Sequence, residues 1–429
     1  MLHNEQETLP NGLTLLWLNL EHVHSAAVVA WVAGGPVCET TRNQGVTHFL
    51  EHLHCSSTRD LPDRKSMMTA IDAIPGSIDA GTDPNGVVFS WTTSPEFLGS
   101  VIDLMSEMLP ARPFPSEIID SERALLITEL ASMDGYRFWP FQSLFRNHPY
   151  GLTGGGTEKT IRRMTNNVIE DFDRRMFVAN RMAVAIAGPL SQELKQQARE
   201  RFSRIPDGDA ISLPRAEPPR LSLPRVMVRT GRTRACSVSI GFLLPAPLSP
   251  PARCVMGITH LGLERISSPL FTRLRYENPI AYVFGTDQRR CDGTRVFWIH
   301  GTTRRRYRDE FIREVLGELS HAIHDHDPRP WFEPARREYY HAVQPCLDYP
   351  AALAHRLAKE VFRPEGEEFL SIEEELRLIR GVSWHEVRTV ANEAFASDRV
   401  FVCADARLRM FDDRRLKKRV RQWLASAIN

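Results

Sequence analysis

A proline-rich segment near the middle of the chain constrains the possible fold more than any other feature of the sequence. Five prolines fall between Ile205 and Arg225, at positions 206, 214, 218, 219 and 224. Proline has no amide hydrogen and its φ angle is fixed, so neither a helix nor a central strand continues through such a segment. We therefore predict a linker over residues 206–225 that separates an N-terminal half (1–205) from a C-terminal half (226–429).

The order of predicted elements restarts after the linker. In the first half, apolar runs and helical periodicity predict strands and long helices at 14–20, 26–32, 87–92, 96–109 and 116–133. In the second half, residues 237–244 predict a strand that is followed by a helix from about residue 254. We therefore expect an α+β protein built from two tandem, structurally similar halves.

Charge and cysteine usage exclude several classes of function. The 429 residues include 54 Lys and Arg against 53 Asp and Glu, a formal net charge of +1. A net charge this close to zero produces no long-range electrostatic attraction for nucleic acid or for an anionic membrane, so we expect neither partner. The seven cysteines are scattered without a Cys-x-x-Cys pair, and the N-terminus lacks the pattern of a secretory signal. A cytoplasmic protein is the expectation.

The sequence His48-Phe49-Leu50-Glu51-His52 forms a His-x-x-Glu-His motif on a predicted helix. At about 100° per residue, His52 lies about 40° and Glu51 about 60° from the direction of His48, so the three side chains share one face. Zinc accepts neutral imidazole nitrogens and takes a third protein ligand in catalytic sites. The alternative is a chance pairing on a solvated helix face.

A third ligand would come from a later helix. The predicted helix 116–133 offers Glu122 and Glu129, which are seven residues apart and differ by about 20° in direction. His54 points about 120° away from His48, and Cys55 fits a small buried residue, so neither is expected to bind the metal. In the second half, His260 and Glu264 echo the motif without a second histidine.

These residues resemble the pitrilysin-like (M16-type, inverted-zincin) metallopeptidases, in particular the short-chain branch that includes the mitochondrial processing peptidase and bacterial relatives. In that family 76 residues separate the motif from a ligand glutamate, and here 76 residues lie between His52 and Glu129. The resemblance implies that His48, His52 and Glu129 bind Zn²⁺ and that Glu51 is the general base. It implies that Glu122 orients a ligand histidine.

Two further segments resemble substrate-binding motifs of this family. The segment 269–282, PLFTRLRYENPIAY, is similar to the family's Arg/Tyr motif, with Arg275 and Tyr282 in the matching places. Both side chains donate hydrogen bonds and would bind carbonyls of the substrate backbone; the alternative is an ion-paired arginine and a core tyrosine. The sequence Asp79-Ala80-Gly81-Thr82 resembles the family's edge strand, so the resemblance places main-chain pairing with an extended substrate at Ala80.

The resemblance also implies an architecture and an activity. Each half would be an α/β sandwich with a mainly antiparallel sheet, and one chain would form half of a clamshell chamber. The expected protein is a zinc endopeptidase that cleaves unfolded peptides or leader segments, such as those of peptide-derived natural products. It would act as a homodimer or as a heterodimer with a related subunit. The alternative is a non-catalytic structural or partner subunit of such a heterodimer.

Overall fold

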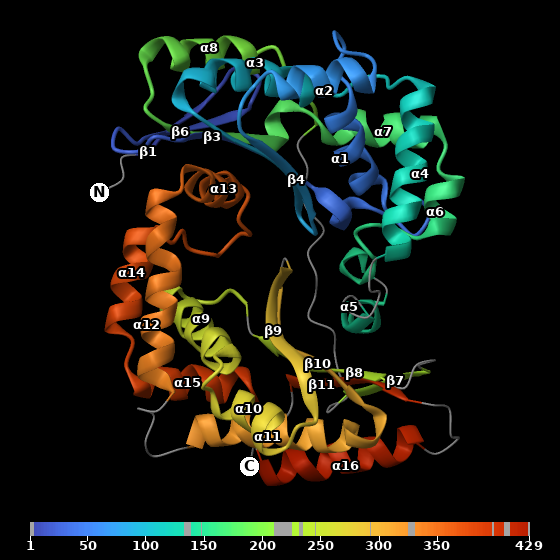
Figure 1. The fold of residues 1–429 in the computed structure, drawn as a ribbon, viewed down its shortest axis with the longest axis vertical. Coiled ribbons are helices and arrows are strands. Elements are labelled where there is room, and N and C mark those ends of the chain that lie inside the picture. Colours follow the sequence, from blue (N-terminus) through green and yellow to red (C-terminus); the bar gives the residue numbers. More distant parts are fainter. Residues whose placement is uncertain are drawn as a thin grey trace. The chain divides into compact units, whose positions relative to one another are not determined.

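The chain forms two compact units (Figure 1). The computed structural model describes residues 4–132, 139–146, 148–209, 225–230, 235–244, 246–291, 293–324, 331–396, 399–406 and 412–427. The first unit comprises Met1–Pro214 with Pro345–Arg363, and the second comprises Arg215–Gln344 with Pro364–Asn429. Most of the predicted linker, residues 210–224, lies outside the described residues.

A six-stranded mixed sheet forms the centre of the first unit, in the order β1-β2-β6-β3-β5-β4. Its strands are β1 (Asn4–Thr8), β2 (Thr14–Asn19), β3 (Ala26–Ala33), β4 (Ser77–Asp83), β5 (Gly86–Thr93) and β6 (Met182–Gly188). Only β2 and β6 pair in parallel; the other neighbours are antiparallel. Every residue of β3 and of β6 is buried, as expected for central strands covered on both faces.

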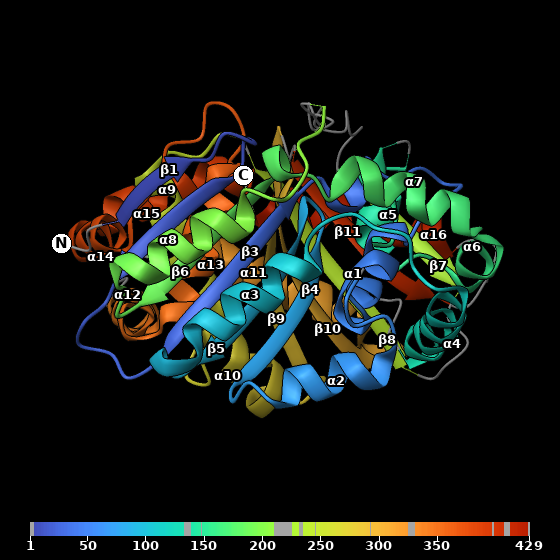
Figure 2. The same cartoon turned by 90° about the horizontal axis from the view of Figure 1, so that it is seen from above.

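Helices cover both faces of this sheet. Figures 1 and 2 show α3 and α8 on one face and α13 on the opposite face. The helices of this unit are α1 (Val46–Ser56), α2 (Arg64–Asp72), α3 (Leu98–Met108), α4 (Ser116–Ser132), α5 (Trp139–Leu144), α6 (Glu158–Arg163), α7 (Asn166–Met176), α8 (Gln192–Phe202) and α13 (Pro350–Val361). Alternate residues of β3, such as Val28 and Val32, join the core that also contains Phe49 and Leu53 of α1. The core thereby anchors α1 beside the sheet.

Helix α13 belongs to the first unit although it follows the proline-rich segment in the sequence. It packs on β2, β3, β5 and β6, with Leu353, Ala354 and Ala358 buried. Lys359 makes an ion pair of 2.8 Å with Asp83 of β4. The second unit therefore differs from the predicted C-terminal half 226–429 in this segment. The physical reason is that the N-terminal helices leave one apolar face of the first sheet for another helix to cover.

The second unit repeats the plan of the first. Its strands are β7 (Arg225–Thr230), β8 (Ala235–Leu244), β9 (Ala281–Cys291), β10 (Thr294–Arg304) and β11 (Val400–Ala406). Their order β7-β11-β8-β10-β9 matches β2-β6-β3-β5-β4, and the pair β7 and β11 is parallel as β2 and β6 are. The expectation of two similar α/β halves with mainly antiparallel sheets is confirmed.

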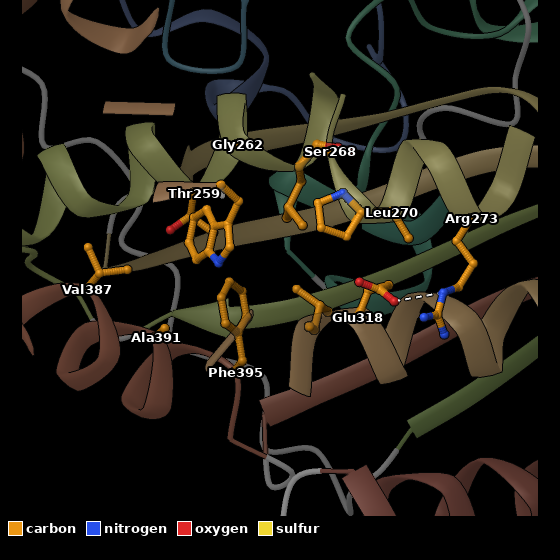
Figure 3. A pocket seen from close by; sticks show the side chains of 13 residues that line it. Thr259, Gly262, Ser268, Leu270, Arg273, Glu318, Val387, Ala391 and Phe395 are labelled. Atoms are coloured by element: carbon orange, nitrogen blue, oxygen red, sulfur yellow. Dashed lines mark hydrogen bonds and ion pairs between the residues drawn. The ribbon is translucent and has the colours of Figure 1, made fainter. Parts of the chain in front are cut away.

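The helices of the second unit surround a second core. They are α9 (Pro250–Glu264), α10 (Pro269–Thr272), α11 (Arg308–His324), α12 (Phe332–Val343), α14 (Ile372–Gly381), α15 (Trp384–Ala394) and α16 (Asp412–Ala427). They leave a pocket of about 190 Å³ that is lined by apolar side chains such as Leu270 and Phe395, with an ion pair between Arg273 and Glu318 (Figure 3). Among the described residues, no helix combines the length and apolar character that a bilayer-spanning segment needs.

Candidate metal centre

Helix α1 begins at a close approach between two backbones. Its N-cap, Gly45, has a φ angle of +91°, in the left-handed region that favours glycine. A Cβ atom there would lie 2.7 Å from the Cα of Gly156, so a larger residue would displace one of the two segments. The glycine run at 154–156 thus helps to position the start of α1.

A buried carboxylate takes the place of the side-chain cap that Gly45 lacks. The two oxygens of Glu39 accept hydrogen bonds from the backbone N–H groups of Gly45, at 2.8 Å, and Thr47, at 2.9 Å. These N–H groups belong to the first turn of the helix, where no intrahelical acceptor exists. Burial raises the pKa of Glu39 to about 7, against the two hydrogen bonds, which lower it. Glu39 therefore holds the helix at the end next to His48.

Three side chains from two helices bring nitrogen and oxygen donors together. Nε2 of His48 and Nε2 of His52 lie 3.6 Å and 3.4 Å from Oε2 of Glu129 on α4. Four ligands arranged tetrahedrally at zinc distances are about 3.3 Å apart, so this spacing fits the ion. In the part of the chain that the structure describes, this is the one group of three His, Cys, Asp or Glu that could hold a metal.

The protonation of His48 and the carboxylates around His52 suit metal binding. Burial lowers the pKa of His48 to about 4, so its imidazole is neutral at neutral pH and one ring nitrogen has a lone pair for a metal ion. Burial also disfavours the charged form of His52, but the carboxylates of Glu122, Glu51 and Glu129 outweigh it and raise the pKa of His52. A cation at this point would replace the proton as the partner of those carboxylates.

Glu122 supports the metal centre from behind His52. Its carboxylate is almost fully buried, and Oε2 lies 3.2 Å from Nδ1 of His52. Oε1 accepts hydrogen bonds from Ser56, at 2.6 Å, and from Arg64. Burial raises the pKa of Glu122, but the hydrogen bonds with His52 and Ser56 and the charge of Arg64 lower it by more, so the group is a carboxylate. This arrangement holds the proton of His52 on Nδ1 and leaves Nε2 to face Glu129.

Glu51 lies on the same face of α1 but is bound to the sheet. The hydroxyl of Thr82 on β4 donates a hydrogen bond to Oε2 of Glu51. Burial raises the pKa of Glu51, and the hydrogen bond from Thr82 opposes this rise. The carboxylate is therefore fixed in direction beside the metal-binding group and is a better proton acceptor than an exposed glutamate.

Two stretches of the chain match domains of one peptidase family. Residues 16–140 match the family described as Insulinase (Peptidase family M16), and residues 163–329 match the Peptidase M16 inactive domain. The chain belongs to peptidase family M16. The resemblance inferred from the motifs of the sequence is confirmed.

Relatives within the M16 family carry protease names. An uncharacterized zinc protease of Mycobacterium leprae (strain TN) is 29% identical over 288 residues, which are 64% of this chain and 63% of that protein. The beta subunit of the mitochondrial-processing peptidase of Dictyostelium discoideum is 27% identical over 204 residues, 46% of this chain and 43% of the subunit. These matches therefore span less than two thirds of either relative.

Solved structures support the M16 fold. The crystal structure of a protease from Helicobacter pylori superimposes with a TM-score of 0.82 at 18% identity, covering 94% of this chain and 99% of that one. At this level of identity the comparison concerns the fold alone.

The edge strand of the M16 resemblance lies where it was predicted. Asp79, Ala80, Gly81 and Thr82 belong to β4, which pairs only with β5 among the described strands. The other margin of β4 has no partner among those strands, and pairing of an extended peptide at Ala80 stays a prediction.

Arg275 and Tyr282 contact each other in the second unit. The guanidinium of Arg275 lies 4.5 Å from the centre of the Tyr282 ring and 5.2 Å from that of Phe271. Tyr282 is 75% exposed, so it is no core residue, and Arg275 has no carboxylate partner within the described residues. The alternative of a buried tyrosine and an ion-paired arginine is therefore wrong. Their binding to substrate stays a prediction.

The structure accounts for the residues near the motif that were not expected to bind the metal, and for the echo of the motif in the second unit. Both nitrogens of His54 are occupied, by the carbonyl of Met108 at 2.6 Å and by Asp173 at 2.8 Å. Burial raises the pKa of the Cys55 thiol to about 12, so it stays protonated. In the second unit, Thr286 of β9 contacts His260 through its hydroxyl and Glu264 through its backbone N–H, whereas Thr82 binds Glu51 through its hydroxyl.

Sequence reasoning missed the residues that orient the site from a distance. Glu39, Arg64 and Thr82 act on it through hydrogen bonds across 6 to 58 positions of sequence. No local pattern marks Arg64 or Thr82 for these roles. Ser56 could have been found, because it follows His52 by four residues and so shares its face of α1.

Proposed function

We propose that this chain is a zinc-dependent endopeptidase that hydrolyses unfolded peptides. The observation that carries the proposal is the convergence of His48, His52 and Glu129 on one point, with Glu51 beside them on the same helix face. Two imidazoles and one carboxylate are one of the ligand sets of catalytic zinc centres, which keep a further position open for water or substrate.

Glu51 would transfer the proton during peptide hydrolysis. Zinc, when bound, supplies a Lewis acid that polarises a peptide carbonyl and makes water more acidic. Glu51 would take the proton of the attacking water on Oε1, because Oε2 is bound to the hydroxyl of Thr82. It would then deliver this proton to the departing amine. The raised pKa of Glu51 suits both steps, since the group must bind a proton and release it.

The edge position of β4 among the described strands supports an extended substrate. Pairing at Ala80 uses main-chain groups, which a folded protein has already paired within itself. Unfolded peptides and leader segments, including those of peptide-derived natural products, are therefore the proposed substrates.

We propose a dimer, either of two copies or with a related subunit. The M16 resemblance is the support for this part, together with the presence in one chain of the metal-binding group and of Arg275 and Tyr282, which favours a homodimer. Sedimentation and activity would be measured over the same concentration range. Full activity of a monomer at nanomolar concentration would refute the dimer. The cytoplasmic location also stays a prediction, which cell fractionation would test.

The deciding experiment compares three purified, zinc-analysed proteins on a library of unstructured peptides, with products read by mass spectrometry. They are the wild type, Glu51→Gln, and Glu117→Gln as a control on an exposed position of α4. We expect cleavage by the wild type and the control, and none by Glu51→Gln despite an unchanged zinc content. Cleavage by zinc-loaded Glu51→Gln would overturn the mechanism. Absence of cleavage by the zinc-loaded wild type would favour the non-catalytic partner subunit.

A further inference from the structure

A basic groove in the second unit is the feature that the metal centre leaves unexplained. It has a volume of about 1130 Å³ and is formed by the start of β9, the end of β10 and the turns that flank them. Its lining includes four arginines, Arg275, Arg304, Arg305 and Arg306. None of the twelve described residues that line it is Asp or Glu. A groove of this size and charge suits an anionic polymer segment better than a small ligand.

Tyrosine rings hold two of these arginines in place. Arg275 lies 4.5 Å from the centre of the Tyr282 ring, and Arg306 lies 4.5 Å from that of Tyr307, with Nη2 donating to the Tyr307 hydroxyl at 2.7 Å. A guanidinium stacked on a ring keeps most of its N–H groups directed outward in the plane. Such a group is prepared to bind a carboxylate through two parallel hydrogen bonds.

Arginines next to the groove, in contrast, form ion pairs with carboxylates. Arg273, two positions before Arg275, pairs with Glu318 at 2.9 Å (Figure 3). It also pairs with Glu314 at 3.3 Å. Arg308 pairs with Asp309 at 2.8 Å. Within the described residues, neither Arg275 nor Arg304 nor Arg306 has a carboxylate partner.

The backbone beside these arginines can pair with a peptide. Strand β9 is the last strand of the five-stranded sheet in the described part of the chain. Its pairing with β10 shifts register between Thr302, which faces Val283, and Thr303, which faces Ala281. Tyr282 therefore has no directly opposite residue on β10. This irregularity turns Tyr282 and Val283 outward, with exposed fractions of 75% and 62%. An extended chain added at this edge would run directly past the arginines.

We propose that this groove binds the carboxylates of an extended peptide, so that the peptides taken up are acidic in the segment that lies there. The inference rests on the proposed function, because it specifies which peptides the enzyme takes. Carboxylates come from acidic side chains or from the C-terminus of the peptide, and both would pair with the guanidinium groups. Each would form charge-assisted hydrogen bonds with Arg304 and Arg306.

Binding is measured separately from cleavage, with the zinc-loaded full chain carrying Glu51→Gln. Fluorescence anisotropy would follow three labelled, unstructured peptides of about ten residues. One is rich in Glu with an amidated C-terminus, one replaces each Glu by Gln, and one is the Gln peptide with a free C-terminus. We expect the Glu peptide to bind at least about tenfold more tightly than the amidated Gln peptide, a preference that weakens with added salt. Tighter binding of the free C-terminus would identify that carboxylate as the ligand.

Variants in the same background locate the binding. The double variant Arg304→Ala/Arg306→Ala should lose most of the preference, and the Lys double variant should keep part of it because the charge remains. Arg377→Ala, which removes a 70% exposed arginine from α14, should leave the preference unchanged. Equal binding of all three peptides, or a preference that survives the Ala double variant, would overturn the groove assignment. Neither result would affect the proposed peptidase, which is judged by cleavage with the wild type.

Discussion

Replacement of Glu122 by Gln tests whether the residues behind His52 tune the metal centre. Glu122 accepts from three donors: Oε1 binds Ser56 and Arg64, and Oε2 faces Nδ1 of His52. Glutamine has nearly the same shape but only one acceptor oxygen. That oxygen should face Arg64 and Ser56, since two donors, one of them charged, meet there. The NH₂ group must then face His52.

The consequence would be a change of tautomer at the metal-binding histidine. An amide NH₂ donates, so Nδ1 of His52 could accept only by giving up its proton to Nε2. Nε2 is the nitrogen that faces Glu129, and a proton there competes with a metal ion. Loss of such an orienting partner costs about 10- to 100-fold in metal affinity, or about 1.4–2.7 kcal/mol.

The assay is competition for zinc against a chromogenic chelator at fixed pH and ionic strength. Glu117→Gln provides the control, because it makes the same chemical change at an exposed position of the same helix. We expect Glu122→Gln to bind zinc at least about tenfold more weakly than the control. An affinity within twofold of the wild type, in a protein of unchanged circular dichroism, would refute this role of Glu122.

Four further predictions concern stability. Glu39 accepts hydrogen bonds from two N–H groups at the start of α1, so Glu39→Ala should lower the free energy of unfolding by about 2 kcal/mol. Urea denaturation measures this change, and a value below about 0.5 kcal/mol would contradict the capping role. His54→Ala should cost about 3 kcal/mol because it leaves Oδ1 of the buried Asp173 without its partner, while Oδ2 keeps the backbone N–H of Arg112. The folded variant should keep its zinc content, and loss of zinc without loss of stability would contradict a purely structural role of His54. Ala354→Asp should cost about 3 kcal/mol or more if α13 is buried on the first sheet, and normal stability would show that it is not. In metal-free protein, the pKa of Glu122 is lower folded than unfolded, so its stabilisation is present above pH 4.5 and is lost as the pH falls through the folded value. The difference in stability between wild type and Glu122→Gln should therefore narrow below pH 4.5, and a constant difference would contradict the direction of that shift.

Local periodicity was sufficient to predict the chemical groups of the metal centre. His48, Glu51 and His52 share a face because a helix advances about 100° per residue, and Glu122 and Glu129 share a face for the same reason. Proline and glycine were equally informative, because their backbone restrictions act wherever the chain runs. The repeated order of strand and helix predicted two similar halves, which the two sheets display.

Contacts between distant parts of the sequence could be identified only from the tertiary structure. The hydrogen bonds from Thr82 to Glu51 and from Arg64 to Glu122 depend on where β4 and α2 lie beside α1. The place of α13 depends on which sheet face remains uncovered, and no property of residues 350–361 specifies that face. The sequence by itself determined which groups each element carries, since that follows from backbone geometry within one element. Only the tertiary structure decided which carboxylates are buried, paired or left open, because burial and pairing depend on neighbours that the fold brings together.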